Sequence, residues 1–131
     1  MTGEIRKFES GATRDTDKNK LDYEGFLSPI VLRAYAEYLD KHRALPDGST
    51  RDSDNWQGLF GEKHLDVCIK SMFRHFVYVW TIHRGFEPRI EKGEPVTLND
   101  ALGGVIFNAM AYWFKLLKEK TPEKTIVDLS E

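Results

Sequence analysis

Three stretches of the chain repeat apolar residues at the spacing of an α-helix. The first begins at Ser28 and Pro29, which are typical of an N-cap and a first helical position, and it predicts a helix to about Arg43. Its apolar stripe comprises Val31, Ala34, Tyr35, Tyr38 and Leu39. The second stretch runs from His64 to about His83. In it we expect these residues to face inward: Leu65, Cys68, Ile69, Met72, Phe73, Phe76, Val79 and Trp80.

The third stretch, LNDALGGVIFNAMAYWFKLLKEK (98–120), is apolar on nearly every face and predicts a central helix. Thr97 and Asp100 have the spacing of a capping box at its start, with Asp in place of the usual Glu. Asp100, Gly104 and Asn108 recur every four residues and therefore share one face. Either the glycines let another backbone or a flat ligand approach this face, or the set is a capping Asp, a helix-packing glycine pair and a polar core contact.

The segments outside these helices lack a helical period. Residues 1–27 form a polar arm, which we expect to be irregular, and residues 121–131 form a tail whose Thr-Ile-Val is typical of an extended, docked segment. Residues 84–95 hold two prolines and two glycines and predict a long loop. The chain is therefore expected to form a single all-α domain over residues 1–131, with a core of three main helices at 28–120.

Composition narrows the class of protein. With 40% hydrophobic and 31% charged residues, the 131-residue chain suits one soluble domain. The formal net charge of −2 argues against a protein that binds duplex nucleic acid. The single cysteine, Cys68, excludes an internal disulfide, and its place on an apolar stripe favours a core role. No signal-peptide core or bilayer-spanning run is evident, so we expect a cytoplasmic protein without a membrane partner.

Aromatic residues make up 12% of the chain, which is more than three helices can bury among themselves. Phe107, Tyr112, Trp113 and Phe114 lie on different faces of the third helix. Exposed aromatic surface of this kind is typical of an interface. We therefore expect a dimer or a higher homo-oligomer.

Charged residues gather in two similar strings, TRDTDKNK (13–20) and STRDSDNWQ (49–57). The repeat is either chance in a polar chain or two sides of one site for a charged ligand. Lys70 and Arg74 are spaced for one helix face, which suits either phosphate binding or a solvated basic stripe. Apolar neighbours on both sides of Arg74 predict a semi-buried guanidinium. His75 and His83 are eight residues apart, which disfavours a histidine-only metal site.

Carboxylates are the ligands that magnesium prefers in phosphate chemistry. Along this chain they are scattered, and only folding brings them together; the candidates are Glu37, Asp40, Asp52, Asp54, Glu62, Asp66 and Asp100. No glycine-rich phosphate loop of standard spacing occurs.

The ordered strings GATRDTDKNKLDYEGFLSP, RDSDNW, RHF and FNAM resemble a phage-borne family of dATP/dGTP diphosphohydrolase-like proteins, related in outline to the all-α nucleotide pyrophosphohydrolases of MazG type. The likeness runs from about Gly11 to Leu117. The matching positions are Gly11, Ala12, Arg14, Asp15, Tyr23, Asn55, Trp56, Arg74, His75 and Asn108. The magnesium-binding Glu-Glu-x-x-Glu of the all-α enzymes is absent, and Glu37-Tyr-Leu-Asp40 has the spacing of their Glu-x-x-Asp but lies on the first helix.

The resemblance implies a purine-nucleotide site. In it Arg51 contacts phosphate, Trp56 stacks on or walls the site, and Asp52 or Asp54 contacts a metal, a ribose or a base amino group. Local Asx turns at Asp52 and Asp54 and a core role for Trp56 are the alternatives. The full expected set of nucleotide-binding residues is Arg14, Lys18, Lys20, Arg51, Asp52, Asn55, Trp56, Lys70, Arg74, His75 and Asn108.

Two functions are consistent with such a site. The first is magnesium-dependent hydrolysis of dATP or dGTP to the monophosphate and pyrophosphate, with Asp54 and Asp100 as catalytic residues and Asp54, Asp100 and Glu37 as metal ligands. Arg51 and Arg74 then stabilise charge in the transition state. The second is a non-catalytic sponge that sequesters a host immune signal, such as a cyclic oligonucleotide or a cyclic ADP-ribose derivative. Basic and aromatic residues suffice for binding, whereas hydrolysis needs the metal cluster.

Overall fold

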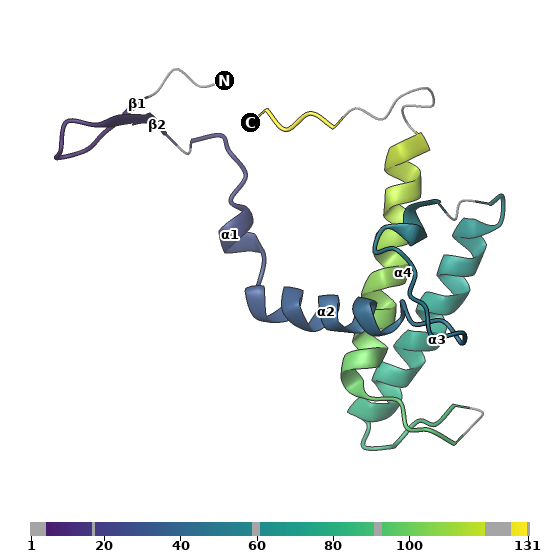
Figure 1. The fold of residues 1–131 in the computed structure, drawn as a ribbon. Helices are drawn as coiled ribbons and strands as arrows, with labels where there is room; N and C mark the ends of the chain where they lie inside the picture. Colours follow the sequence, from purple (N-terminus) through teal and green to yellow (C-terminus); the bar gives the residue numbers. More distant parts are fainter. Residues whose placement is uncertain (1–4, 17, 59–60, 91–92, 120–126, 131) are drawn as a thin grey trace.

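The computed structural model describes residues 5–16, 18–58, 61–90, 93–119 and 127–130. Figure 1 shows two long helices, α3 and α4, side by side and a third helix, α2, crossing α4. The described elements are, in chain order, β1 (Ile5–Lys7), β2 (Thr13–Asp15), α1 (Tyr23–Phe26), α2 (Pro29–Lys41), the 3-10 helix η1 (Asn55–Gly58), α3 (His64–His83) and α4 (Leu98–Glu119). The mostly helical fold and its three main helices are therefore confirmed.

Small side chains fill the contacts made by α4. Its buried residues are Ala101, Gly103, Gly104, Asn108 and Ala111. Residues of this size let a helix approach its neighbours closely. Both α2 and α3 pack on α4, so the expectation of a central third helix is confirmed.

Gly103 and Gly104 are the points where α4 meets the other two helices. A Cβ at Gly103 would overlap the ring of Tyr38 from α2, and a Cβ at Gly104 would overlap the ring of His75 from α3. These two rings occupy the space that the glycines leave. The Asn108 Nδ2 donates to the Gly104 carbonyl at 2.7 Å, so the buried amide finds a partner within α4. Helix packing and a polar core contact therefore account for this face.

The helix starts follow the sequence signals. The Ser28 hydroxyl accepts a hydrogen bond from the Val31 N–H at 3.3 Å, ahead of α2. The Thr97 hydroxyl accepts one from the Asp100 N–H at 3.1 Å, ahead of α4. The Asp100 carboxylate pairs with the Lys41 Nζ at 2.5 Å, and this ion pair joins the start of α4 to the end of α2.

The amino-terminal arm is more regular than expected. β1 and β2 form an antiparallel pair in which Ile5 faces Asp15, and Gly11 lies in the turn with a φ of 90°. α1 is a single turn capped by the Asp22 carboxylate, which accepts from the Gly25 N–H at 2.9 Å. Three-residue strands are too short to show an alternating pattern, which is why the sequence suggested an irregular arm. Figure 1 shows this hairpin well away from the helices.

Many apolar residues are exposed in the chain by itself. Of the residues expected to face inward on α3, Phe73, Phe76 and Trp80 are more than half exposed and Ile69 is 40% exposed, which corrects that expectation. On α2, Val31 is also exposed, because the first half of the helix extends beyond α4. Among the described residues, no helix is long and apolar enough to span a membrane. The Thr-Ile segment of the tail lies outside the described residues.

Candidate functional site

The loop that follows α2 folds back onto the end of that helix. Residues Ala44 and Thr50 form an antiparallel bridge, and Gly48 turns the loop with a φ of 89°. The Arg51 N–H donates to the Arg43 carbonyl at 2.9 Å, and the Arg43 Nε donates to the Arg51 carbonyl at 2.7 Å. This two-way link fixes the acidic loop beside the last turn of α2.

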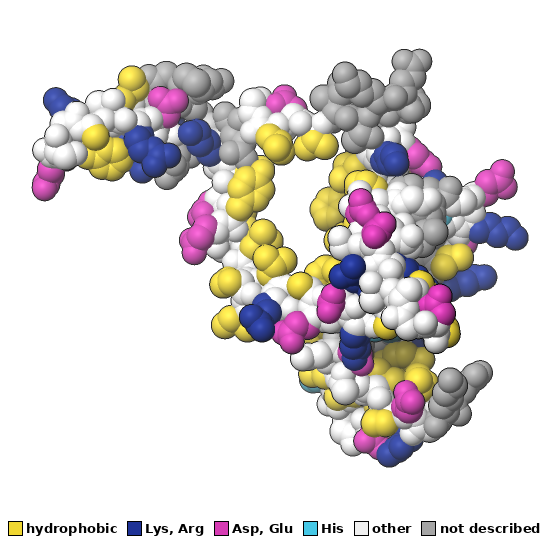
Figure 2. Space-filling view, viewed as in Figure 1, with side chains coloured by type: hydrophobic (Ala, Val, Ile, Leu, Met, Phe, Trp, Pro, Cys, Tyr) yellow, Lys and Arg dark blue, Asp and Glu magenta, His cyan; other side chains and the backbone are white. Residues whose placement is uncertain are grey.

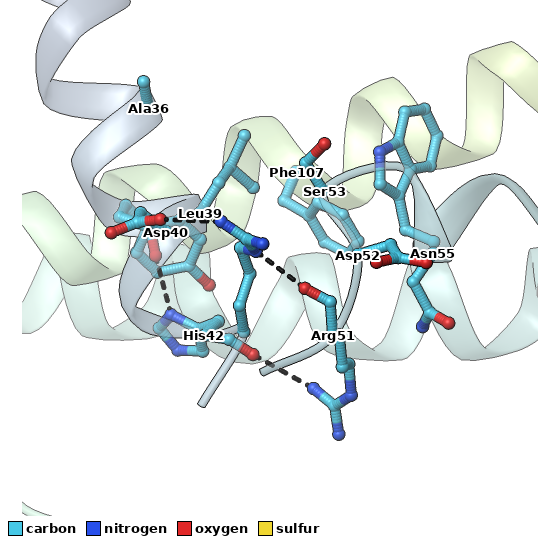
Figure 3. A pocket seen from close by; sticks show the side chains of 12 residues that line it. Ala36, Leu39, Asp40, His42, Arg51, Asp52, Ser53, Asn55 and Phe107 are labelled. Carbon is cyan, nitrogen blue, oxygen red and sulfur yellow. Dashed lines mark hydrogen bonds and ion pairs between the residues drawn. The ribbon is translucent and has the colours of Figure 1, made fainter. Parts of the chain in front are cut away.

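A pocket of about 680 Å³ lies between the end of α2, this loop and α4. Figure 3 shows side chains from all three of these elements around it. We call it the Trp56 pocket, and its lining residues are Ala36, Tyr38, Leu39, Asp40, His42, Arg43, Arg51, Asp52, Ser53, Asn55, Trp56 and Phe107. Four residues expected from the sequence are thereby brought together: Arg51, Asp52, Asn55 and Trp56.

Arg51 is exposed and has one side-chain hydrogen bond to a described residue. Its Nη1 donates to the His42 carbonyl at 3.0 Å, at the carboxyl end of α2 (Figure 3). A guanidinium has five N–H groups, so most of its donors have no hydrogen bond to a described residue, and Figure 3 shows them pointing away from Phe107, at the rim of the pocket. The neighbouring Arg43 is instead held by the Asp40 carboxylate, which accepts from its Nη1 at 3.2 Å.

Trp56 contributes an aromatic wall that is anchored to α4. Its ring meets Phe107 edge-on, with centroids 6.0 Å apart, and Phe114 with centroids 5.1 Å apart. Trp56 therefore packs on α4 and also lines the pocket, and its contact with a nucleotide stays a prediction. Trp56 as a whole is half-buried.

The acidic residues of the loop do not form the local turns considered from the sequence. The Asx-type bond belongs to Asp47, whose carboxylate accepts from the Ser49 N–H at 2.9 Å, and the hydrogen bonds to Ser49 hold the pKa of that carboxyl below its ordinary value. The side chains of Asp52 and Asp54 make no hydrogen bond to a described residue, and both are exposed. Asp52 lines the pocket and Asp54 does not.

The three expected metal ligands lie in different places. Asp54 is on the loop, Glu37 pairs with Arg33 on the outer side of α2 at 3.4 Å, and Asp100 pairs with Lys41. Within the described ranges, no three His, Cys, Asp or Glu side chains are arranged to hold a metal ion. These residues therefore do not fit a magnesium site within one chain, and a role for magnesium stays a prediction.

The expected residues of α3 and α4 lie outside the Trp56 pocket. Lys70 and Arg74 are exposed, and the Arg74 Nη2 donates to the Ser71 hydroxyl at 3.0 Å, so the expectation of a semi-buried Arg74 is wrong. The apolar neighbours of Arg74 in sequence face other directions around the helix. His75 and Asn108 are held in the contacts with Gly104 already described.

The expected basic residues of the arm lie apart from the pocket as well. Arg14 lies on β2 opposite Arg6, and Lys18 and Lys20 follow in the segment that leads to α1. All three are exposed. Figure 1 places their hairpin beyond the free end of α2, on the far side from α3.

Several pocket residues were not expected from the sequence. Tyr38 and Phe107 belong to the apolar patterns of α2 and α4, and these patterns do not distinguish a pocket wall from a core residue. Burial, with the Asp100 charge nearby, raises the pKa of the Tyr38 hydroxyl. His42 and Arg43 follow the last turn of α2. The turn signal Pro-Asp-Gly, a few residues later, indicates that the chain folds back here and could have drawn attention to them.

Comparison with known proteins leaves the chain without an assigned family, because no family model, no curated protein and no solved structure matches it. The likeness to dATP/dGTP diphosphohydrolase-like proteins therefore stays a prediction. The chemistry of the Trp56 pocket is a guanidinium, an amide and a carboxylate set among aromatic and aliphatic walls.

Proposed function

We propose that the Trp56 pocket binds a purine nucleotide. One observation carries the proposal: Arg51, Asp52, Asn55 and Trp56, singled out by the sequence, line a single pocket with Phe107. Its volume of about 680 Å³ lies in the range of small-ligand sites. The resemblance to a nucleotide-handling phage family supports the same class of ligand.

Each side of the pocket suits one part of a nucleotide. The exposed Arg51 guanidinium offers a fork of donors for phosphate oxygens at the rim of the pocket, on the side away from Phe107. Trp56, Phe107 and Leu39 offer flat and aliphatic surface for a purine ring. The Asn55 amide and the Asp52 carboxylate offer a donor and acceptors for the polar edge of a base or for ribose hydroxyls.

Replacement of Arg51 is the direct test of binding. We expect Arg51→Ala to weaken the binding of dATP or dGTP, measured by titration calorimetry, by about ten- to a hundredfold, the loss typical of hydrogen bonds to a charged group. The matched control is Arg33→Ala, because Arg33 lies on the same helix as the pocket wall, is 83% exposed and pairs with Glu37 outside the pocket. Equal affinities for both variants, or no purine nucleotide bound by the native chain under any metal condition, contradict the proposal.

Between the two modes of action, retention of the intact nucleotide is favoured over hydrolysis. The carboxylates required for metal-dependent hydrolysis are engaged separately, Glu37 with Arg33 and Asp100 with Lys41. We propose a protein that holds a nucleotide or nucleotide-derived signal and releases it unchanged, as an anti-defence sponge of a phage does. The alternative is release of pyrophosphate from dATP or dGTP.

A single experiment distinguishes these modes. The protein is incubated with dATP, dGTP and cyclic oligonucleotides in the presence of magnesium or manganese, then denatured, and the released molecules are separated by chromatography. We expect the intact ligand in stoichiometric amount. Monophosphate and pyrophosphate in place of intact ligand contradict the sponge, and loss of that product in Asp54→Ala and Asp100→Ala then assigns these two residues to catalysis.

A further inference from the structure

The chain exposes far more surface than a folded protein of its mass. Its accessible surface is 10949 Å², whereas a compact monomer of 15.2 kDa exposes about 7,100 Å². A stable interface of standard size needs only about 800 Å² from each partner. The excess is therefore large enough for an extensive interface.

Part of the excess accessible surface belongs to an apolar stripe on the side of α4 that faces away from α3. Its members, which we call the outer stripe, recur at helical spacing and are between 38% and 66% exposed: Leu98, Leu102, Ile106, Trp113 and Leu116. The helix carries no charged residue from position 101 to position 114. An uncharged helix face of this length is typical of a buried one.

A second apolar surface lies on the part of the chain that projects from the helices. Residues 21–31, the docking segment, comprise α1 and the first turn of α2. Six of its side chains are more than half exposed: Leu21, Tyr23, Phe26, Leu27, Ile30 and Val31. Figure 2 shows hydrophobic side chains on both sides of the open space that α1, α2 and α4 enclose.

We propose that the outer stripe of a second copy of this chain fills that space. In a two-fold dimer the two outer stripes pack against each other, and the docking segment of each copy covers the exposed flank of its partner's outer stripe. The arrangement is reciprocal, as a two-fold interface requires, because each copy supplies both the space and the helix that fills it. It does not depend on nucleotide binding, since the Trp56 pocket lies on a different side of α4.

The area explains why a second copy, and not the docking segment of the same chain, is the occupant. Folding the docking segment onto its own α4 would cover one side of the stripe and leave the rest of the excess surface in water. Two copies cover both surfaces at once. Interfaces between permanent partners bury from about 2,000 Å² to more than 5,000 Å² in total, or about 1,000 to 2,500 Å² from each partner, and the excess surface of one chain is large enough to supply its share.

The first test measures mass by light scattering during size-exclusion chromatography. We expect the native chain to have at least twice the 15.2 kDa of one copy and Trp113→Glu to have the mass of one copy, with helical circular dichroism retained. The matched control is Trp80→Glu, because Trp80 is a tryptophan of α3 with a similar exposure, 58% against 66%, that lies outside the outer stripe. We expect this control to remain at least dimeric. A native chain with the mass of one copy overturns the proposal.

The second test does not depend on a variant that can fail to fold. A photoreactive phenylalanine analogue replaces Phe26, and this chain is mixed with uniformly ¹⁵N-labelled native chain before irradiation. We expect cross-linked peptides that join residue 26 of the unlabelled chain to α4 of the labelled chain. Cross-links only within one chain, or only to α3 of the second, overturn the proposal.

Discussion

The His75 ring packs between helices, and one of its nitrogens is buried without a hydrogen-bond partner among the described residues. Its ring fills the space beside Gly104 and meets Tyr78 edge-on at 5.7 Å between centroids. Within the described part of the chain, its Nδ1 is the one buried side-chain nitrogen or oxygen without a hydrogen-bond partner. An unpaired buried nitrogen lowers stability, so this position tolerates the loss of the nitrogen better than the loss of the ring.

The same environment makes the free energy of unfolding depend on pH. Burial, together with the charges of Arg74 and His42, lowers the pKa of the His75 imidazole from its ordinary value of 6.5. The unfolded chain therefore binds a proton more readily, and the stability contributed by the neutral ring is complete above pH 6.5 and is lost as the pH falls below it.

We expect His75→Phe to reduce this pH dependence, because the phenyl ring keeps the packing and does not titrate. The measurement is the free energy of unfolding in urea at about pH 7.5 and about pH 5.5, on either side of the ordinary histidine value. The native protein should lose more stability between these two conditions than the variant. The control is His83→Phe at the exposed end of α3, which should keep the native difference. An equal loss in His75→Phe and native protein contradicts the assignment.

At the scale of the elements, the glycine pair of α4 sets how closely three helices meet. In an unpacked helix, Gly→Ala gains about 1 kcal/mol from helix propensity. At Gly104 the added methyl group meets the ring of His75, and overpacking of this kind typically costs about 1–3 kcal/mol. We therefore expect Gly104→Ala to lower the denaturant midpoint, whereas Gly58→Ala, where nothing lies within 4 Å, should change it little. A Gly104→Ala variant as stable as the native chain would show that α3 and α4 lie further apart.

The sequence was sufficient for the long helices because their signals are local. Ser28 and Thr97 mark helix starts through hydrogen bonds to residues three positions away, Pro29 suits a first helical position, and the periodic pattern gave the bounds of α3. The sequence was insufficient to predict contacts between helices. Nothing in the local pattern indicates that Phe73 stays exposed or that Asp100 pairs with Lys41, since both depend on how the helices are placed.

For the candidate site, too, the sequence predicted what depends on local order and missed what depends on contacts between elements. Arg51, Asp52, Asn55 and Trp56 were found because they lie within six successive positions of one loop and its 3-10 helix. Glu37, Asp54 and Asp100 belong to three elements, and their separation is set by tertiary packing that periodicity does not describe. The pocket walls from α2 and α4 were missed for the same reason.

At the scale of the whole molecule, the distribution of charge suggests that two chains complete each site. The Trp56 pocket holds the aromatic walls and Arg51, whereas Arg14 and the lysines that follow it lie on the projecting arm. The docking segment that we place on a second copy connects this arm to α2. In the proposed dimer, the arm extends toward the partner, and we expect Arg14 to contact phosphates in the partner's pocket.

Mixing two defective variants tests this arrangement. Arg51→Ala impairs the pocket and leaves the arm intact, while Arg14→Ala impairs the arm and leaves the pocket intact. If the arm serves the partner, each mixed dimer has one pocket with Arg51 that receives an arm with Arg14, and its other pocket lacks both. We expect the mixture, after denaturation and refolding together, to recover tight dGTP binding in calorimetric titration that neither variant shows alone. A mixture that binds no better than the two variants measured separately contradicts sharing, because an arm that serves its own pocket leaves every site with one residue missing.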